Sequence, residues 1–254
     1  MAATDYVIAV PTYKRADHFQ RNTLQVLRDH GLVDRLFVFV GSDLAEYKAL
    51  EPDLRYVSVP VGKHRAVKAI CEYFPVGQAI LFMDDDLSDY CMYDASSDGF
   101  IRTGLADVIA EGFAHAPFSF GFLRNRLWLR KSPRLRPQYG LMAGGFFGVF
   151  NQPELITTTH ASLDDTLRTI QYLKAGIVPW TFPGASFKTY YGKTPGGLQA
   201  SGDRADTRKV CEEVADQVQP FCSEMVLHPE GLWAWKWKPA ATVRRLFKAN
   251  LSTH

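Results

Sequence analysis

The sequence contains few cysteines and no long apolar run, and these absences exclude several classes of protein. Its four cysteines show no C-x-x-C spacing, so we expect reduced, mostly buried thiols and no disulfide framework. The longest nearly apolar run, at 141–150, is too short to cross a bilayer. The first residues lack the charged and apolar regions of a signal peptide. The sequence therefore predicts a soluble, cytoplasmic protein with no membrane partner.

Acidic residues are absent from two long stretches. None occurs between Gly112 and Pro153, and none follows Glu230. Cations occupy both stretches: Arg124, Arg126, Arg130, Lys131, Arg134 and Arg136 in the first, and Lys236, Lys238, Arg244, Arg245 and Lys248 in the second. Residues 84–98 show the opposite bias, with no basic residue. The formal net charge of +2 implies no polyanionic partner, but this uneven distribution predicts surfaces with different tasks.

Glycine-rich phosphate loops are also missing. The apolar run at 6–10 leads into PTYKR, which matches neither G-x-G-x-x-G nor the P-loop pattern. Dinucleotide and Walker-type phosphate cradles are therefore excluded. In the functional interpretation Thr12 and Arg15 contact a base or phosphate of a nucleotide. In the alternative, the stretch is a strand-ending turn with a solvated Lys14 and Arg15.

The first half of the chain alternates apolar runs with helical patterns. The runs predict strands at 6–10, 35–40, 55–59 and 78–83, and helices lie between them at 19–31 and 62–74. Strands that are apolar throughout and alternate with helices indicate an α/β fold with a mostly parallel sheet and helices on both faces. Ligands bind such sheets at the carboxyl ends of the strands. The polar clusters that follow the strands should therefore converge on one crevice: Thr12–Arg15, Ser42–Asp43, Gly62–Arg65 and Asp84–Asp86.

Three consecutive aspartates follow the fourth predicted strand. On an extended backbone Asp84 and Asp86 point the same way, while Asp85 points to the other side. Two carboxylates on one side can hold a divalent metal that also binds the oxygens of a diphosphate. The alternative is an acidic turn whose carboxylates are only solvated.

Charged residues also occupy two predicted helix starts. Lys63 and Arg65 begin a helix, where the positive end of the helix dipole disfavours cations. An anion bound by both would remove this conflict. Asp164 and Asp165 begin a later helix, where acids stabilise the dipole without any catalytic role.

The second half of the chain is less regular. A glycine-interrupted strand is predicted at 141–151, where Gly144 and Gly145 would allow a ligand to approach the backbone. Ser162, three residues before Asp165, predicts a capping box at the start of the following helix.

Tryptophans accompany the cations of both basic stretches. Trp128 lies in the first, and alternation places Trp233, Trp235 and Trp237 on one side of an extended segment. Cations neutralise phosphates, and aromatic rings can stack on a base displaced from a helix. In the alternative interpretation the tryptophans belong to the core and the arginines form a solvated surface.

Six segments in this order resemble the metal-dependent glycosyltransferases of the GT-A fold: PTYKR, GSD, GKHRAVKAICEYFP, ILFMDDDL, GGFFGVF and LDDTLRTIQYLKAG. The resemblance covers residues 6–180 and implies one GT-A, Rossmann-like domain over 1–254. Residues 1–100 would bind the nucleotide-sugar donor, and 101–254 the acceptor.

The resemblance also assigns roles to individual residues. Asp84 and Asp86 would hold Mn²⁺ or Mg²⁺ against the donor diphosphate, and Asp165 would be the catalytic base. Asp164 stands where the family usually has Glu. A late histidine often binds the metal in this fold; His228 is the candidate and His160 the alternative, although a lone histidine can be structural. The residues expected to contact the donor are Pro11, Thr12, Tyr13, Arg15, Ser42, Lys63, Arg65, Asp84, Asp85, Gly144 and Gly145.

A narrower resemblance rests on PTYKR and HRAVKAICEYFPVGQAILFMDDDL. These segments are similar to the phage-encoded TET-associated glycosyltransferases, which are thought to add sugars to hydroxymethylated pyrimidines in DNA. This implies a UDP-sugar donor and a 5-hydroxymethylpyrimidine acceptor in phage DNA, within the host cytoplasm.

Three alternatives remain open. The acceptor could be a glycan, a lipid or a protein. A sugar nucleotidyltransferase also uses a strand-end aspartate and a metal, but it normally needs a glycine-rich basic loop after the first strand, and PTYKR has no glycine. A non-catalytic nucleic-acid-binding module would explain the basic stretches but not the carboxylates.

Overall fold

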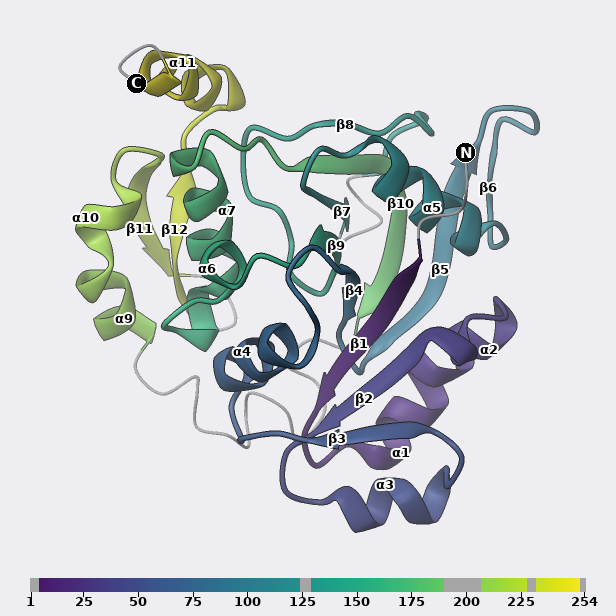
Figure 1. The fold of residues 1–254 in the computed structure, drawn as a ribbon. Helices are drawn as coiled ribbons and strands as arrows, with labels where there is room; N and C mark the ends of the chain where they lie inside the picture. Colours follow the sequence, from purple (N-terminus) through teal and green to yellow (C-terminus); the bar gives the residue numbers. More distant parts are fainter. Residues whose placement is uncertain (1–4, 124–128, 190–206, 228–231, 252–254) are drawn as a thin grey trace.

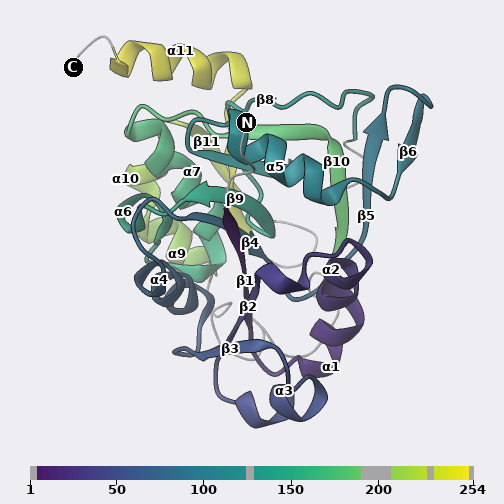
Figure 2. The ribbon, with the colours of Figure 1, turned by 45° about the vertical axis from the view of Figure 1, so that its right-hand side comes forward.

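The computed structural model of the chain describes residues 5–123, 129–189, 207–227 and 232–251. One large twisted sheet runs through the molecule (Figures 1 and 2). Its strands, in spatial order, are β3 (Arg55–Ser58), β2 (Leu36–Val40), β1 (Tyr6–Thr12), β4 (Ala79–Met83), β9 (Phe146–Phe150), β7 (Ser119–Leu123), β10 (Trp180–Thr189), β5 (Leu87–Asp94) and β6 (Gly99–Ile101), with β8 (Arg136–Pro137) paired to β10.

The four strands predicted from the first half of the sequence form one side of this sheet. β1 pairs with β2 and β4, and β2 pairs with β3, all in parallel. The first predicted strand, 6–10, is too short, because β1 continues through Pro11 to Thr12. Proline is tolerated here since β4 pairs with β1 only as far as Ala9, so its missing N–H breaks no bond on that side.

The other side of the sheet is less uniform. β9 pairs antiparallel with both β4 and β7, and β5 pairs antiparallel with β10 and β6. β7 and β10 are parallel. The predicted strand at 141–151 is shorter than expected, because only Phe146–Phe150 is extended within the sheet. Both glycines of interest therefore lie in the segment that leads into β9.

Helices cover both faces of the sheet, as predicted. One face carries α1 (Ala16–Phe19), the π-helical turn η1 (Gln20–Leu24), α2 (Gln25–Asp29), the 3₁₀ turn η2 (Val33–Arg35), α3 (Leu44–Leu50) and α5 (Leu105–His115). The other face carries α4 (Lys63–Tyr73), α6 (Pro153–Ile156), the 3₁₀ turn η4 (Ala161–Leu163) and α7 (Asp164–Lys174). Figure 1 shows α1–α3 gathered beside the parallel strands, with α4 on the opposite side.

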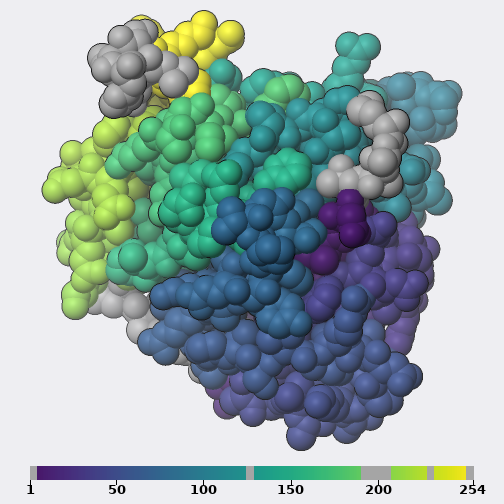
Figure 3. Space-filling model, viewed as in Figure 1, coloured from purple at the N-terminus to yellow at the C-terminus, as the bar shows by residue number. Residues whose placement is uncertain are grey.

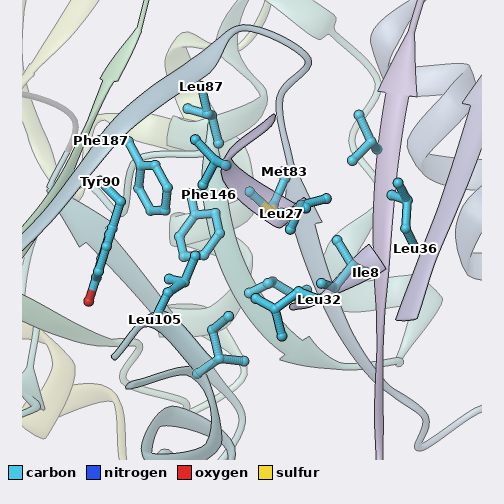
Figure 4. Close-up of a cluster of buried hydrophobic side chains, with 14 of the residues drawn as sticks. Ile8, Leu27, Leu32, Leu36, Met83, Leu87, Tyr90, Leu105, Phe146 and Phe187 are labelled. Carbon is cyan, nitrogen blue, oxygen red and sulfur yellow. The ribbon is translucent and has the colours of Figure 1, made fainter. Parts of the chain in front are cut away.

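Alternation along the strands divides the core between these faces. Ile8 and Met83 point into the first core, which also contains Leu27 of α2 and the aromatic rings of Phe146 and Phe187 (Figure 4). The residues that alternate with these along the strands, such as Ala9 in β1 and Phe82 in β4, point into the second core, against α4, α6 and α7. A one-residue change of register would exchange these sets, so the apolar pattern fixes the pairing.

The C-terminal segment forms a smaller layer outside α7. It consists of α9 (Thr207–Glu213), α10 (Ala215–Val218), the hairpin of β11 (Cys222–Leu227) and β12 (Trp233–Trp237), and α11 (Ala240–Leu251). Its buried residues meet Leu163, Leu167 and Ile170 of η4 and α7 in a third core. α7 therefore contributes to two cores, since its Tyr172 belongs to the second.

The tryptophans of β12 pack against this third core. Trp233, Trp235 and Trp237 are half-buried there, and the Trp235 indole donates to the backbone oxygen of Cys211 at 3.2 Å. This favours the core interpretation over base stacking. All four cysteines are free and buried, as predicted. Among the described residues, no helix combines the length and the apolar character needed to cross a bilayer.

Candidate active site

The three aspartates lie in a tight turn between β4 and β5. Met83 ends β4, and Leu87 begins β5 after a turn at Asp85 and Asp86. The extended backbone expected for all three aspartates is not found, because Asp85 and Asp86 form a turn. Asp85 and Asp86 both lie near one guanidinium, while Asp84 is directed toward the start of α4.

Electrostatic repulsion within the turn is strong. Burial, followed by repulsion from Asp84 and Asp85, raises the pKa of Asp86 to about 7. Burial also raises the pKa of Asp85, which the Arg15 charge and the Thr12 hydroxyl oppose. Such clustered carboxylates are unfavourable unless cations balance them.

The segment after β1 supplies the first balancing cation. The Arg15 guanidinium lies 3.1 Å from Asp85 Oδ1 and 3.7 Å from Asp86 Oδ2. Thr12 Oγ1 donates to Asp85 Oδ2 at 2.7 Å. Both side chains are buried. Thr12 and Arg15 thus face the aspartates at the strand ends, as the sequence predicted.

Lys63 joins the aspartates to the acids of α7. Its ammonium lies 3.4 Å from Asp84 Oδ1 and 3.5 Å from Asp164 Oδ2. Burial lowers the pKa of Lys63, but the charges of Asp164, Asp84 and Asp165 outweigh it and raise the pKa above its usual value. The unfavourable place of a cation at a helix start is thus offset by carboxylates of the protein itself.

A buried arginine holds the acidic pair at the start of α7. Arg168 lies 3.5 Å from Asp164 Oδ2 and 3.3 Å from Asp165 Oδ1, and it is 1% exposed. Its guanidinium stacks 4.1 Å from the ring centre of Phe147. The predicted capping box is wrong: Leu163 is the N-cap residue and no side chain caps the helix, since Ser162 lies within η4.

The two acids differ in environment. The Asp164 side chain is 10% exposed and contacts both Lys63 and Arg168, whereas that of Asp165 is 22% exposed. Burial raises the pKa of Asp164 to about 6, although Lys63 opposes the shift. Asp165 is the more accessible carboxylate of the pair.

Gly144 and Gly145 leave the space in which the charged side chains of this cluster approach one another. A β-carbon at Gly144 would lie 2.0 Å from Asp165 Oδ1 and 2.4 Å from Arg168 Nη2. At Gly145 it would lie 3.1 Å from Asp84 Oδ2. The close approach predicted here is therefore made by the site's own side chains.

Comparison with solved structures identifies the frame that carries these residues. A mannosyltransferase, PcManGT from Pyrobaculum calidifontis in complex with GDP-Man and Mn²⁺, matches with a TM-score of 0.53 and 14% identity, over 98% of this chain and 74% of that one. GalNAc-T7 with UDP, GalNAc and Mn²⁺ matches with a TM-score of 0.54 and 12% identity, over 86% of this chain and 48% of that one. The chain has the GT-A fold. No protein-family model and no curated protein sequence matches it.

The remaining predicted residues lie around the GT-A strand ends with fewer contacts. Pro11 is half-buried in β1, and Tyr13 packs against Gly41. Ser42 is exposed after β2, and Arg65 is exposed on α4. No described hydrogen bond or ion pair joins these four side chains to the aspartates.

The two histidine candidates have different outcomes. His228 lies outside the described residues. The His160 imidazole lies 3.9 Å from a carboxylate oxygen of Glu213 in α9. It thus faces the C-terminal layer.

The aspartate turn of the GT-A frame fits a divalent cation. Within the described residues, no three His, Cys, Asp or Glu side chains form a complete metal site. Mg²⁺-type sites commonly use one or two carboxylates and complete their shell with phosphate oxygens and water. Asp84 and the buried Asp86 supply such a pair, and repulsion from Asp84 contributes to the raised pKa of Asp86.

Two site residues were missed from the sequence. Arg168 follows the acids by three and four positions, a helical spacing that could have revealed it. Asp43 belongs to the predicted Ser42–Asp43 cluster; it accepts the Lys14 backbone N–H at 2.9 Å through Oδ2, while its buried Oδ1 has no described partner. Tyr47, buried on α3, contacts Thr12 across 35 residues of sequence, and no local pattern indicates it.

Proposed function

We propose that this protein is a metal-dependent glycosyltransferase that moves a sugar from a nucleotide-sugar donor to a hydroxyl acceptor. One observation carries the proposal. On a GT-A frame, Lys63 bridges Asp84 at the end of β4 and Asp164 at the start of α7. The carboxylates suited to a metal and diphosphate and those suited to a base therefore form one cluster.

The donor and metal would occupy the strand ends of residues 1–100. Asp84 and Asp86 would hold Mn²⁺ or Mg²⁺, which stabilises the charge that develops on the leaving diphosphate. Arg15 and Lys63 place positive charge at the same edge. Both similar structures hold Mn²⁺ with a nucleotide or nucleotide sugar. We propose a UDP-sugar as the donor.

The acceptor would approach from residues 101–254. Asp165 would take the proton of the acceptor hydroxyl as that oxygen attacks the anomeric carbon. Its greater exposure favours it over Asp164 for this role, and Arg168 fixes its orientation. Asp164, held by two cations, would act as its buried partner.

We further propose that the acceptor is a 5-hydroxymethylpyrimidine in DNA. The sequence resemblance supports this, and so does the distribution of cations. Arg130, Arg134 and Arg136 are exposed on a segment anchored to β10, where the Arg130 amide donates to the Pro183 oxygen at 2.9 Å. The guanidinium of Arg244 in α11 lies 5.7 Å from the ring centre of Tyr139, so α11 adjoins this segment.

Two basic stretches remote in sequence thus lie at one end of the molecule. Both ribbon views place α11 at the same end as β8, and α11 projects there in the space-filling view (Figures 1–3). α11 also exposes Arg245 and Lys248. This surface suits contact with phosphates.

The direct test is a transfer assay. The protein is incubated with UDP- and GDP-sugars, with Mn²⁺ or with a chelator, and with duplex DNA that contains or lacks 5-hydroxymethylcytosine. We expect a sugar-sized mass increase on the modified nucleoside only with Mn²⁺. Transfer to a glycan, lipid or protein in place of DNA would keep the chemistry and replace the acceptor. Failure of every donor to be consumed or bound would contradict the function itself.

Neutralising Arg130, Arg134 and Arg136 together should flatten the salt dependence of DNA binding. Each phosphate contact contributes a slope of about −0.9 in log affinity against log salt on duplex DNA. Lys131 is left unchanged because it already pairs with Asp98 at 2.9 Å. Titrations at several salt concentrations measure the slope.

The control for this experiment neutralises three exposed cations elsewhere: Arg21, Lys48 and Lys174. It should leave the slope unchanged, and both triple variants should bind donor normally. Equal slopes in the two triple variants would exclude the proposed surface. If neither duplex nor single-stranded DNA binds at low salt, DNA is not the acceptor.

A further inference from the structure

The hydrogen bonds behind Asp85 form a chain that ends on α3. Asp85 Oδ2 accepts from Thr12 Oγ1 at 2.7 Å, and Thr12 Oγ1 lies 2.6 Å from the Tyr47 hydroxyl. The same hydroxyl accepts the backbone N–H of Arg15 at 3.0 Å. Tyr47 is 1% exposed, and Thr12 is 6% exposed. The chain is thus shielded from solvent that could replace its bonds.

Each bond of the chain has a fixed direction. A threonine hydroxyl has a single proton, and Thr12 uses it on the Asp85 carboxylate. Oγ1 can then only accept from Tyr47, whose phenol proton is thereby used in turn. The Tyr47 oxygen retains a lone pair for the Arg15 amide. The order is therefore Arg15 N–H to Tyr47, Tyr47 to Thr12, and Thr12 to Asp85.

Tyr47 fixes Arg15 and Asp85 at once. The Arg15 backbone is held by the phenol, while its guanidinium lies 3.1 Å from Asp85 and 3.7 Å from Asp86. The loop after β1 and the aspartate turn are thus held together by one buried hydroxyl. Hydrogen bonds in such a chain polarise and strengthen one another.

We propose that Tyr47 is a positioning residue for the aspartate turn, which it holds in the arrangement that takes a divalent cation and a diphosphate. It touches neither ligand and acts through Thr12 and Arg15. This inference rests on the proposed function, since it assumes that the turn binds metal and donor.

The test is Tyr47→Phe, which keeps the ring and removes only the hydroxyl. The Arg15 amide and the Thr12 oxygen would each lose a buried partner. We expect about tenfold weaker binding of Mn²⁺, measured by electron paramagnetic resonance, and of UDP with Mn²⁺, measured by calorimetry. In the metal-free protein, amide hydrogen exchange at Arg15 should become faster.

Tyr56→Phe provides the matched control. The Tyr56 hydroxyl donates to the backbone oxygens of Tyr47 at 3.1 Å and Glu51 at 2.8 Å. Its removal breaks partly buried bonds in the same region but leaves the chain to Asp85 intact. We expect lower thermal stability with unchanged Mn²⁺ and UDP affinities.

A second set of variants separates positioning from general destabilisation. Thr12→Ser keeps the hydroxyl, so Tyr47→Phe should have its full effect in that background. Thr12→Val breaks the arm of the chain that leads to Asp85 but leaves the bond from the Arg15 amide to Tyr47. In that background Tyr47→Phe should therefore add only the part of the loss that passes through Arg15, which is smaller than its full effect. Simple additivity in both backgrounds would overturn the proposal.

Two further outcomes are distinguishable. If the wild-type protein binds UDP in a Mn²⁺-dependent way and Tyr47→Phe matches Tyr56→Phe, the positioning role is overturned while the proposed function stands. If wild-type binding of UDP is the same with Mn²⁺ and with chelator, the proposed metal chemistry is wrong, and the role of Tyr47 is overturned with it.

Discussion

Replacement of Asp165 by asparagine is expected to slow sugar transfer by about 10²–10⁴-fold, because general-base catalysis typically contributes that much. Asparagine keeps the size of the side chain and can still accept from Arg168, which lies 3.3 Å from Asp165 Oδ1. It cannot take a proton from the acceptor. Donor affinity should stay normal, since the aspartate turn is unchanged. Single-turnover kinetics with saturating donor measure the effect.

Asp107→Asn serves as the control for this variant. Asp107 is exposed in the first turn of α5, so its replacement removes an acid from the same part of a helix. The helix-dipole effect is about 0.3–1 kcal/mol at exposed sites. We expect a small loss of stability and normal transfer. If Asp165→Asn behaves like this control, Asp165 has only a structural role.

Replacement of Asp86 by alanine is expected to abolish the difference between nucleoside-diphosphate binding with Mn²⁺ and binding with chelator. A metal held by one or two carboxylates and by phosphate oxygens loses much of its protein anchorage when one carboxylate is removed. Interactions of this kind are worth several kcal/mol, so on the order of hundredfold weaker binding is expected. Calorimetry with UDP under both conditions provides the measurement.

The Asp86 variant should remain folded. Burial and repulsion from its neighbours raise the pKa of Asp86 to about 7, so its charge is unfavourable in the metal-free protein. Arg15 keeps a partner in Asp85. Asp94→Ala is the control: its carboxylate accepts from Ser96 and Ser97 in the exposed turn between β5 and β6. Metal-dependent binding that survives in Asp86→Ala as it does in this control would contradict the metal assignment.

The sequence could predict that the site residues lie close together, because it shows where each parallel strand ends. Apolar runs located the parallel strands, and parallel strands bring the residues that follow them to one edge. Thr12, Lys63 and Asp84 were found in this way although they lie far apart in the chain. The turn at Asp85 and Asp86 was not predicted, because three identical residues do not distinguish a turn from a continued strand.

Other features depend on tertiary contacts that leave no local pattern. Tyr47 meets Thr12 only because α3 packs beside β1. The capping box at Ser162 has the right spacing, but a 3₁₀ turn occupies that position. β7 and β10 form inner strands whose glycines and proline weaken the strand pattern. In each case packing between remote segments decides the conformation.

α7, the helix that carries Asp164 and Asp165, belongs to two cores, and this constrains when the site can form during synthesis. Its Tyr172 packs against the central sheet, while Leu167 and Ile170 pack against residues of α9, α10 and α11. A nascent chain that has released only the sheet would expose that second apolar face. The helix that carries the acidic pair would thus be packed on one side only until Val243 and Phe247 of α11 have left the ribosome and joined the third core.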